Sequence, residues 1–416
     1  MKTRHTIGGL AALSALAASL LIPLGAANAA EDFYAIPATL PAQNGTIVKQ
    51  EASSFYLEPL KLTPAQAQVQ RIMYKSTDSQ GQPIAATGTV LMPKTPWLKL
   101  QDPLRPWLGV SERPLVAFNP GTKGNGDQCA PSKRLATGED YEGAIVKGLL
   151  AAGYAVTIPD YQGVGTAPKS TYMARVATGN AVLDAVRAAQ RSGLAGLPGN
   201  GPVLLSGYSQ GGEATAAASE LAASYAPELK IIGAYAGAVP ANLLEVAKFL
   251  EGGLYQAFLL SAVSGIATAE NIDLTKYANA AGLAAIAQND GLCTVESIAP
   301  SAFQDTAKYT LSGQKLSVLA QTDPTIRAAL EKQLIGKAAP TKFPVLVAQS
   351  LLDDVIEPTQ TKAMAQQWCQ GGATVQFENS VVPTHVGAAA GFLPTMFGFL
   401  AARVNGSPAV NNCAAL

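Results

Sequence analysis

The pentapeptide Gly207–Gly211, with the sequence GYSQG, places a serine between two glycines, an arrangement that could make it a nucleophile. A serine hydroxyl attacks weakly unless it is exposed to a base and held in one pose, which a sharp turn achieves. Glycine at positions 207 and 211 removes the Cβ atoms that would collide in such a turn. The sequence therefore predicts that Ser209 is the nucleophile of a covalent reaction, whereas a plain glycine–serine turn is the alternative.

The base that would activate Ser209 is identified by counting histidines. The sequence holds two, and His5 lies in a segment that we expect to be removed, which leaves His385. Two adjacent acids, Asp353 and Asp354, follow a short apolar run and could orient the imidazole and stabilise its charged form. The order serine, acid, histidine along the chain is the α/β-hydrolase order. We predict a triad of Ser209, His385 and one of these two aspartates.

The segments on either side of the pentapeptide predict the turn that this chemistry requires. The apolar run 203–205 is typical of a buried strand, and residues 214–223, rich in Ala, Glu and Leu, favour a helix. A strand–turn–helix arrangement points the Gln210 N–H and the helix N-terminus toward the place where an oxyanion would form. Gln210 is therefore one expected oxyanion-hole donor.

A second oxyanion-hole donor is expected from the glycine-rich loop 119–129. This loop follows the apolar run 114–118, and in an α/β-hydrolase the loop after this strand supplies a backbone N–H. Its glycines let the backbone approach a ligand closely. We favour the N–H of Thr122, with Asp127 as the alternative.

The order of the predicted elements indicates an α/β fold. Strands, glycine-rich loops and helices alternate on both sides of Ser209, which is the pattern of a mostly parallel sheet flanked by helices. Residues 69–75 and 84–91, joined by a turn cluster, predict an antiparallel pair at a sheet edge. Residues 31–63 show little periodicity and predict an N-terminal arm.

The alternation stops between residues 241 and 336, where the sequence has helical character. We interpret this stretch as a helical cap, or lid, inserted into the fold. The predicted organisation is a signal peptide at 1–30, a first part of the core at 31–240, the cap at 241–336 and a second part of the core at 337–416. The predicted fold class is an α/β-hydrolase fold with an inserted helical cap.

Aromatic and aliphatic side chains are the candidates for binding a substrate. Tyr161 lies at the carboxyl end of a predicted strand, where parallel sheets place ligands, although a packing role is an equal alternative. Tyr208 lies beside the nucleophile. The cap supplies candidates for an apolar wall over the nucleophile, of which we favour Phe258: Phe249, Leu254, Tyr255, Phe258, Leu259 and Leu260.

Residues 1–30 have the pattern of a signal peptide. Lys2 and Arg4 give a basic start, residues 7–24 form an interrupted apolar run, and a small-residue site ends the segment. We therefore expect cleavage near Ala29 and a secreted or periplasmic protein, with an uncleaved membrane anchor as the alternative.

The charge balance and the spacing of metal-binding residue types disfavour several partners. The segment 1–30 holds two of the 29 basic residues and none of the 29 acidic ones, so 27 basic residues face 29 acidic ones in the rest. This balance disfavours nucleic acid or an anionic membrane surface as a partner. We expect no metal site, because no two cysteines lie close together and one histidine remains. The predicted chemistry also needs no cofactor.

The four cysteines predict two disulfides, because an even number in an exported chain is typical of paired cysteines. Three pairings are possible, of which we favour Cys129–Cys293 with Cys369–Cys413.

Several motifs together resemble the secretory lipases, the family of Candida lipase A and its bacterial relatives, over roughly residues 32–413. They are GYSQGG at 207–212, DYQGVG at 160–165, CAPS at 129–132, and the stretch from KFP at 342–344 to Asp353. The resemblance implies an α/β-hydrolase with a helical cap between its sixth and seventh strands. It also implies cleavage of carboxylic esters, often triacylglycerols.

The resemblance implies roles for individual residues as well. It makes Ser209 the nucleophile, His385 the base and Asp353, rather than Asp354, the acid. The family's proline four residues after its acid is displaced by one residue here, so Asp354 stays an alternative. The resemblance also supports the two disulfide pairings.

We therefore predict an exported serine carboxylic-ester hydrolase, a lipase or a broad esterase, that works through an acyl-enzyme without a cofactor or metal. Its expected partner is an ester or lipid substrate, which it could meet at a lipid–water interface. A serine peptidase or an acyltransferase on the same fold is the alternative, and a non-enzymatic binding protein is a third hypothesis.

Overall fold

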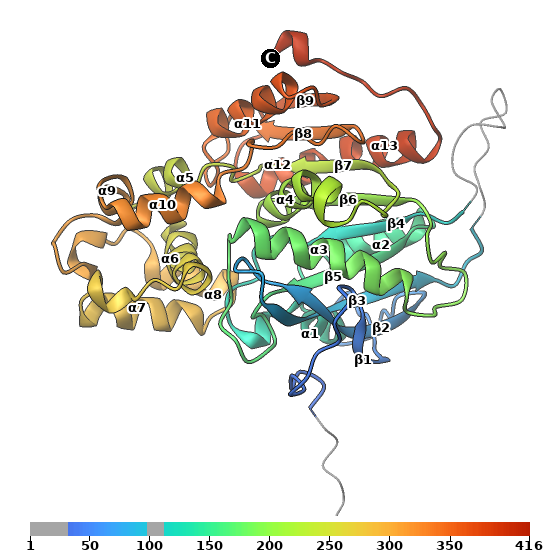
Figure 1. Cartoon of the computed structure of the whole chain (residues 1–416), viewed down its shortest axis with the longest axis horizontal. Coiled ribbons are helices and arrows are strands. Elements are labelled where there is room, and N and C mark those ends of the chain that lie inside the picture. The colour runs from blue at the N-terminus through green and yellow to red at the C-terminus, as the bar shows by residue number, and fades with distance from the viewer. Residues whose placement is uncertain (1–31, 98–111) are drawn as a thin grey trace, which may run out of the picture. The chain divides into compact units, whose positions relative to one another are not determined.

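The computed structural model describes residues 32–97 and 112–416 (Figure 1). The expected signal peptide, residues 1–30, and its cleavage site lie outside the described residues. Residues 34–416 form one compact unit.

Strands in the described residues build one sheet in the order β1-β2-β3-β5-β4-β6-β7-β8-β9. They are β1 (Ile47–Ala52), β2 (Ala67–Thr77), β3 (Pro83–Pro93), β4 (Leu115–Asn119), β5 (Ala155–Tyr161), β6 (Val203–Tyr208), β7 (Ile231–Gly237), β8 (Val345–Ser350) and β9 (Val375–Ser380). Strands β5, β4, β6, β7, β8 and β9 pair in parallel, whereas β1, β2, β3 and β5 pair antiparallel. The predicted α/β class with a mostly parallel sheet is confirmed.

Helices cover both faces of this sheet. They are α1 (Pro131–Thr137), α2 (Gly143–Ala151), α3 (Arg175–Gln190), α4 (Gln210–Tyr225), α11 (Pro358–Gln370), α12 (His385–Gly391) and α13 (Leu393–Val404), with short 3-10 turns η1 (Asp127–Cys129) and η4 (Cys413–Ala415). Figure 1 shows α3 and α4 in front of the sheet. Alternate strand residues enter separate cores, because successive side chains point to opposite faces. Val203 and Leu205 join the core beneath α3 and α4, whereas Leu204 joins the core that includes α2 and α13.

The edge of the sheet differs from the expectation. Residues 69–75 and 84–91 do form an antiparallel pair, as parts of β2 and β3. The outer strand, however, is β1, which lies inside the expected N-terminal arm 31–63 and pairs with β2. No residue of β1 is fully buried. The strand therefore lacks the alternating apolar pattern by which a half-buried strand is found in a sequence.

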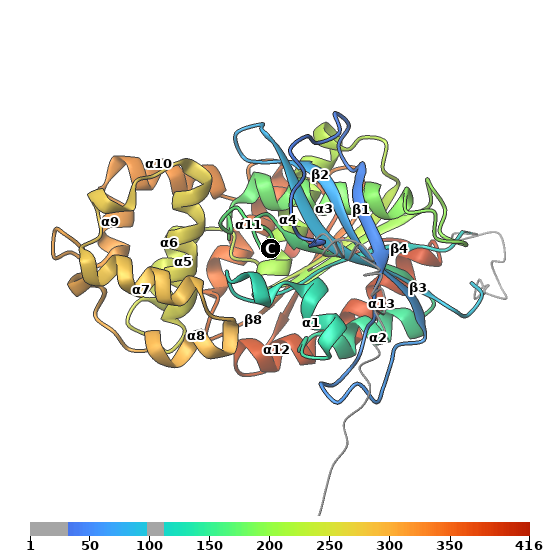
Figure 2. The same cartoon turned by 90° about the horizontal axis from the view of Figure 1, so that it is seen from below.

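Residues 241–336, here called the helical insertion, connect β7 to β8. Their helices are α5 (Leu243–Leu250), α6 (Gln256–Glu270), α7 (Ala280–Asp290), α8 (Thr294–Ser301), α9 (Leu316–Thr322) and α10 (Pro324–Gln333), with 3-10 turns η2 (Leu274–Lys276) and η3 (Thr306–Tyr309). Asn242, Asn279 and Asp323 begin α5, α7 and α10 with side chains that accept backbone N–H bonds. Figures 1 and 2 both show these helices gathered at one end of the sheet.

Two disulfides tie distant segments together. Cys129 of η1 bonds to Cys293 at the start of α8, with Cα atoms 5.4 Å apart. Cys369 of α11 bonds to Cys413 of η4, with Cα atoms 5.5 Å apart. These are the two favoured pairings, and the first joins the sheet with its flanking helices, here called the sheet domain, to the helical insertion.

No single helix of the described residues is long and apolar enough to span a membrane. The helices α12 and α13 reach the required length and apolar composition only when taken together, and they are bent by 42°. Met396, Phe399 and Leu400 of α13 are buried against the sheet.

Candidate active site

Ser209 lies at the turn between β6 and α4 with φ of 62° and ψ of −123°, a backbone conformation that is unfavourable for a residue with a Cβ. The Ser209 N–H donates to the carbonyl of Gly237 at 2.9 Å, which ties the turn to β7. A Cβ at Gly207 would lie 2.2 Å from the carbonyl oxygen of Gly211, and one at Gly211 would lie 2.0 Å from that of Asn119. The close backbone approach therefore explains both glycines of the pentapeptide.

The two adjacent acids contact different parts of His385. Oxygens Oδ2 and Oδ1 of Asp353 lie 2.8 and 3.0 Å from His385 Nδ1. Asp354 is exposed, and its Oδ1 accepts the backbone N–H of His385 at 2.7 Å. The Asp353 carboxylate also accepts the N–H groups of Val355 and Ile356, at 2.9 and 2.8 Å. Such bonds stabilise its charged form and hold it in one orientation.

Tyr208 connects the nucleophile turn to His385. Its phenol donates to the backbone carbonyl of His385 at 3.0 Å, and the two rings lie 4.9 Å apart. Burial raises the pKa of Tyr208 far above its usual value, so the phenol keeps the proton that it donates. The residue beside Ser209 thus contacts the residue that carries the imidazole.

Two backbone N–H groups near Ser209 are free to bind an anion. Gln210 is the first residue of α4, and Thr122 lines the same cavity as Ser209. Within residues 32–97 and 112–416, neither the Gln210 N–H nor the Thr122 N–H has a hydrogen-bond partner. Asp127, the alternative to Thr122, lies at the exposed start of η1 and does not line this cavity.

Four side chains from three segments hold the loop around Thr122. Glu142 accepts the Gly121 N–H at 3.0 Å, and the hydroxyls of Tyr172 and Thr122 are hydrogen bonded at 2.8 Å. The carbonyl of Thr122 accepts the phenol of Tyr141 at 2.8 Å and the hydroxyl of Thr294 at 2.5 Å. None of these four partners was predicted from the sequence, because they belong to no local motif.

A buried ion-pair cluster lies behind this loop. Lys123 Nζ lies 2.7 Å from Asp140 Oδ1 and 2.8 Å from Glu142 Oε2. Its ammonium also lies 3.5 Å from the centre of the Tyr141 ring, within cation–π range. Burial raises the pKa of the Glu142 carboxyl, and the adjacent Lys123 opposes that rise. The cluster fixes the residues that in turn hold Gly121 and Thr122.

An apolar cavity extends from Ser209 and Thr122 into the helical insertion. Phe258, Leu259 and Leu260 of the expected apolar wall line it, whereas Phe249, Leu254 and Tyr255 do not. Tyr172, which sequence reasoning missed, also lines it beside Thr122. Other lining residues from the insertion include Val246, Leu250, Ile266, Ile286, Leu319 and Leu330.

The two tyrosine candidates for substrate binding lie outside the cavity lining. Tyr161 is buried, has a positive φ of 66°, and donates its hydroxyl to the carbonyl of Pro120 at 3.0 Å. Tyr208 binds His385, as described above. The structure thus places Phe258 on the cavity and the two tyrosines in the scaffold around it.

Glu213, in the first turn of α4, is a buried acid that the sequence did not single out. Its side chain is 2% exposed, and neither carboxylate oxygen has a hydrogen-bond partner among the described residues. Burial raises the pKa of Glu213 to about 8. The described residues contain no group of three or more His, Cys, Asp and Glu side chains that could hold a metal ion.

Comparison with known proteins places this fold and these motifs in one family. The family model for secretory lipases matches residues 130–412. Lipase 10 of Candida albicans is 29% identical over 427 residues, covering 97% of this chain and 86% of that protein. A protein of Mycobacterium tuberculosis named a probable inactive lipase is 28% identical over 393 residues, covering 91% of this chain and 82% of its own length.

A solved structure, Candida antarctica lipase A in its closed state, has a TM-score of 0.76 at 24% identity. The match covers 92% of this chain and 88% of that chain, and it shows a shared fold. The resemblance drawn from the sequence motifs and the α/β-hydrolase fold are both confirmed by these comparisons.

Proposed function

The chain belongs to the secretory lipase family, and we propose that it is a serine hydrolase that cleaves carboxylic esters through an acyl-enzyme on Ser209. The observation that carries the proposal is the contact between His385 Nδ1 and Asp353. The same histidine also accepts a hydrogen bond from Tyr208, which precedes Ser209 in the chain. An apolar cavity that begins at Ser209 supports an acyl chain as the group bound there.

The chemistry starts with the tautomer of His385. Because Asp353 accepts a hydrogen bond from the Nδ1–H group, the unprotonated Nε2 is the acceptor that takes the proton of the Ser209 hydroxyl. Ser209 then attacks the ester carbonyl, and Asp353 stabilises the imidazolium that forms. The imidazolium gives its proton to the leaving alcohol. Water, activated by the same histidine, hydrolyses the acyl-enzyme and restores Ser209.

The oxyanion formed in each step needs preorganised donors. The N–H groups of Gln210 and Thr122 fit this role, because Gln210 follows Ser209, Thr122 lines the same cavity as Ser209, and neither N–H is used within the described fold. Gln210 also stands at the N-terminus of α4, where the helix dipole favours negative charge. Losing one such donor typically slows an acyl transfer by about 10²–10³-fold.

The helical insertion, residues 241–336, serves in this proposal as the cap that binds the acyl chain. Phe258, Leu259 and Leu260 form part of its apolar wall. The proposed substrates are carboxylic esters with an apolar acyl group, including lipid esters.

Exposed apolar side chains near the catalytic residues are consistent with binding of the substrate at a lipid–water interface. Leu351, Leu352, Val381 and Val386 are exposed on the segments that carry Asp353 and His385. Hydrogen bonds from Leu351 N–H to the Ser380 carbonyl (2.8 Å) and from Thr384 N–H to the Leu352 carbonyl (3.1 Å) hold these segments together. The preference for an interface is measured by comparing the rate of hydrolysis of emulsified tributyrin with that of a soluble ester.

Export is the other part of the proposal. Residues 1–30 would direct the protein to the periplasm or the medium and would be removed near Ala29. Two disulfides fit such an oxidising compartment. N-terminal sequencing of the protein recovered outside the cytoplasm tests the cleavage site.

The serine assignment is tested by labelling and by mutation. A fluorophosphonate probe should label the wild type once, and Ser209→Ala should abolish both labelling and hydrolysis of p-nitrophenyl butyrate with unfolding nearly unchanged. Because one relative is named a probable inactive lipase, labelling of the wild type comes first. Turnover that survives in Ser209→Ala would reject the assignment. Amide substrates and alcohol acceptors on the same preparation separate a hydrolase of esters from a peptidase or an acyltransferase.

A further inference from the structure

We propose that Thr294, a residue of the helical insertion, positions the oxyanion loop of the sheet domain, so that the insertion is part of the catalytic machinery. The inference rests on the proposed function, because it assigns Thr122 as an oxyanion-hole donor. Thr294 contacts neither the substrate nor the reacting atoms in this proposal. It acts through Thr122 and is therefore a positioning residue.

Two hydrogen bonds join Thr294 to the loop. Its hydroxyl donates to the carbonyl of Thr122 at 2.5 Å, and its backbone N–H donates to the carbonyl of Lys123 at 3.0 Å. Thr122 is 6% exposed, so its carbonyl depends on protein donors rather than on bulk water. Among the described residues, the other donor to this carbonyl is the phenol of Tyr141, at 2.8 Å.

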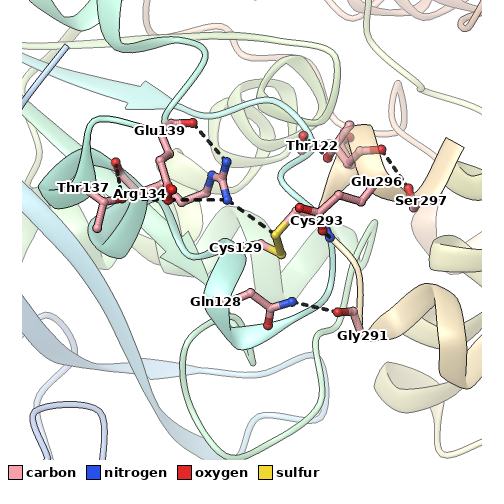
Figure 3. The surroundings of a disulfide bond; sticks show 11 residues. Thr122, Gln128, Cys129, Arg134, Thr137, Glu139, Gly291, Cys293, Glu296 and Ser297 are labelled. Carbon is pink, nitrogen blue, oxygen red and sulfur yellow. Dashed lines mark hydrogen bonds and ion pairs between the residues drawn. A yellow bond between two sulfur atoms is a disulfide. The ribbon is translucent and has the colours of Figure 1, made fainter. Parts of the chain in front are cut away.

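The segment that carries Thr294 is held against the loop by covalent and polar contacts (Figure 3). The disulfide Cys129–Cys293 immediately precedes Thr294, and Gly124 forms a β-bridge with Cys293. Gln128 Nε2 donates to the carbonyl of Gly291 at 2.7 Å. These contacts place the start of α8 on the oxyanion loop rather than over the cavity.

Close backbone approach at Gly124 shows how tightly the two segments fit. Gly124 has a φ of 106°, and a Cβ added there would lie 2.5 Å from the carbonyl oxygen of Leu292. Asn125 Nδ2 also donates to Asp290 Oδ1 at 2.9 Å. The polar atoms of Thr122 are thus held by the insertion on one side and by Tyr172 on the other. The hydroxyls of Thr122 and Tyr172 lie 2.8 Å apart.

The consequence concerns the direction of the Thr122 N–H. An oxyanion donor contributes most when it already points at the developing charge and needs no reorganisation. Removing the Thr294 hydroxyl would leave the Thr122 carbonyl with Tyr141 alone and would let the loop rotate. The edge of the insertion at residues 290–294 must then stay on the sheet domain throughout turnover, and any opening of the insertion takes place elsewhere.

The test compares Thr294→Val, which keeps the side-chain shape but loses the hydroxyl, with Thr294→Ser, which keeps the hydroxyl. Thr294→Val should lower kcat for p-nitrophenyl butyrate about tenfold with KM unchanged, less than the loss of a direct donor. It should weaken inhibition by an alkyl trifluoromethyl ketone, whose adduct mimics the oxyanion, by a similar factor. Thr294→Ser should stay within about twofold of the wild type in both measurements.

Ser297→Ala is the matched control. Ser297 lies in the same helix, is 4% exposed, and donates its hydroxyl to the carbonyl of Thr294 at 2.9 Å; the described residues show no hydrogen bond between Ser297 and Thr122. Its loss should leave kcat and ketone affinity unchanged even where the melting temperature falls. Should Thr294→Val fail to fold, Thr294→Ala takes its place in the comparison with Thr294→Ser.

Several outcomes would overturn the inference. It is wrong if Thr294→Val keeps the wild-type kcat, if its loss appears only in the melting temperature or in KM, or if Thr294→Ser is no better than Thr294→Val. A wild type that neither hydrolyses esters nor reacts with fluorophosphonate would instead remove the proposed function, and the inference with it. An active wild type with an unaffected Thr294→Val rejects the inference alone.

Discussion

The phenol of Tyr208 donates a hydrogen bond to the backbone carbonyl of His385 at 3.0 Å, and Asp354 accepts the backbone N–H of the same histidine at 2.7 Å. The main chain of His385 is therefore held at both of its polar groups, one from β6 and one from the segment after β8. Its imidazole is held separately, by Asp353 at 2.8 Å. The placement of one side chain thus depends on two other segments of the chain.

Tyr208→Phe removes only the hydroxyl of this arrangement. We expect kcat for p-nitrophenyl butyrate to fall about three- to tenfold with KM unchanged, because His385 loses one of two backbone restraints while the cavity keeps its lining. Steady-state kinetics provide the measurement, and Tyr154→Phe, at a buried tyrosine packed on Trp97, is the control. A change confined to KM would contradict a positioning role for Tyr208.

Asp353→Asn and Asp354→Asn should differ strongly. Because Asp353 contacts the imidazole, its amide would favour the wrong tautomer of His385, and kcat should fall about 10³–10⁴-fold. Asp354 accepts only the backbone N–H, so its amide should cost about tenfold or less. Rates of both variants with one ester measure the ratio. Equal losses would reject Asp353 as the acid of the triad.

Glu213→Gln should remove a pH dependence of stability. The folded-state pKa of Glu213 is raised from 4.5 to about 8, so the folded protein keeps a proton that the unfolded chain has released. The free energy of unfolding therefore falls as pH rises through this window, and the loss is complete above pH 8 in the wild type. Urea denaturation at pH 5 and pH 8.5 should show a smaller decrease in Glu213→Gln, by more than about 1 kcal/mol.

The control for that measurement is Glu245→Gln, at a half-buried acid paired with Lys248. It should keep the wild-type dependence on pH. If Glu213→Gln loses as much stability between pH 5 and pH 8.5 as the wild type does, the carboxyl is not the source of the effect.

Phe258→Trp should change the preference for acyl length. Phe258 lines the cavity and lies parallel to the ring of Tyr255 at 5.9 Å, so a larger side chain takes space from a long acyl chain. We expect kcat/KM for p-nitrophenyl palmitate to fall about tenfold relative to p-nitrophenyl butyrate. Phe249→Trp, at an exposed position outside the cavity lining, should leave the ratio unchanged. A ratio that is the same in both variants would remove Phe258 from the acyl site.

Local patterns in the sequence were sufficient to predict those parts of the structure that depend on residues close together in the chain. The GYSQG turn could be predicted because the close approach of Gly207, Gly211 and the strand backbone depends on residues within the turn and one adjacent loop. His385 could be selected because a single histidine remains after residue 30. The parallel sheet followed from the alternation of apolar runs and helical segments.

Contacts between distant segments could not be predicted in this way. Thr122 meets Tyr172 and Thr294, which lie 50 and 172 residues further along the chain, and no local pattern marks either partner. Strand β1 was missed because none of its residues is fully buried and so it carries no apolar alternation. The sequence alone thus determined the residue types of the chemistry and the main elements of the sheet, since these depend on short-range preferences, and its motifs carried the resemblance to the family. Only the tertiary structure decided that Asp353 meets the imidazole while Asp354 meets the backbone, because packing over the whole chain sets which of two adjacent side chains faces inward.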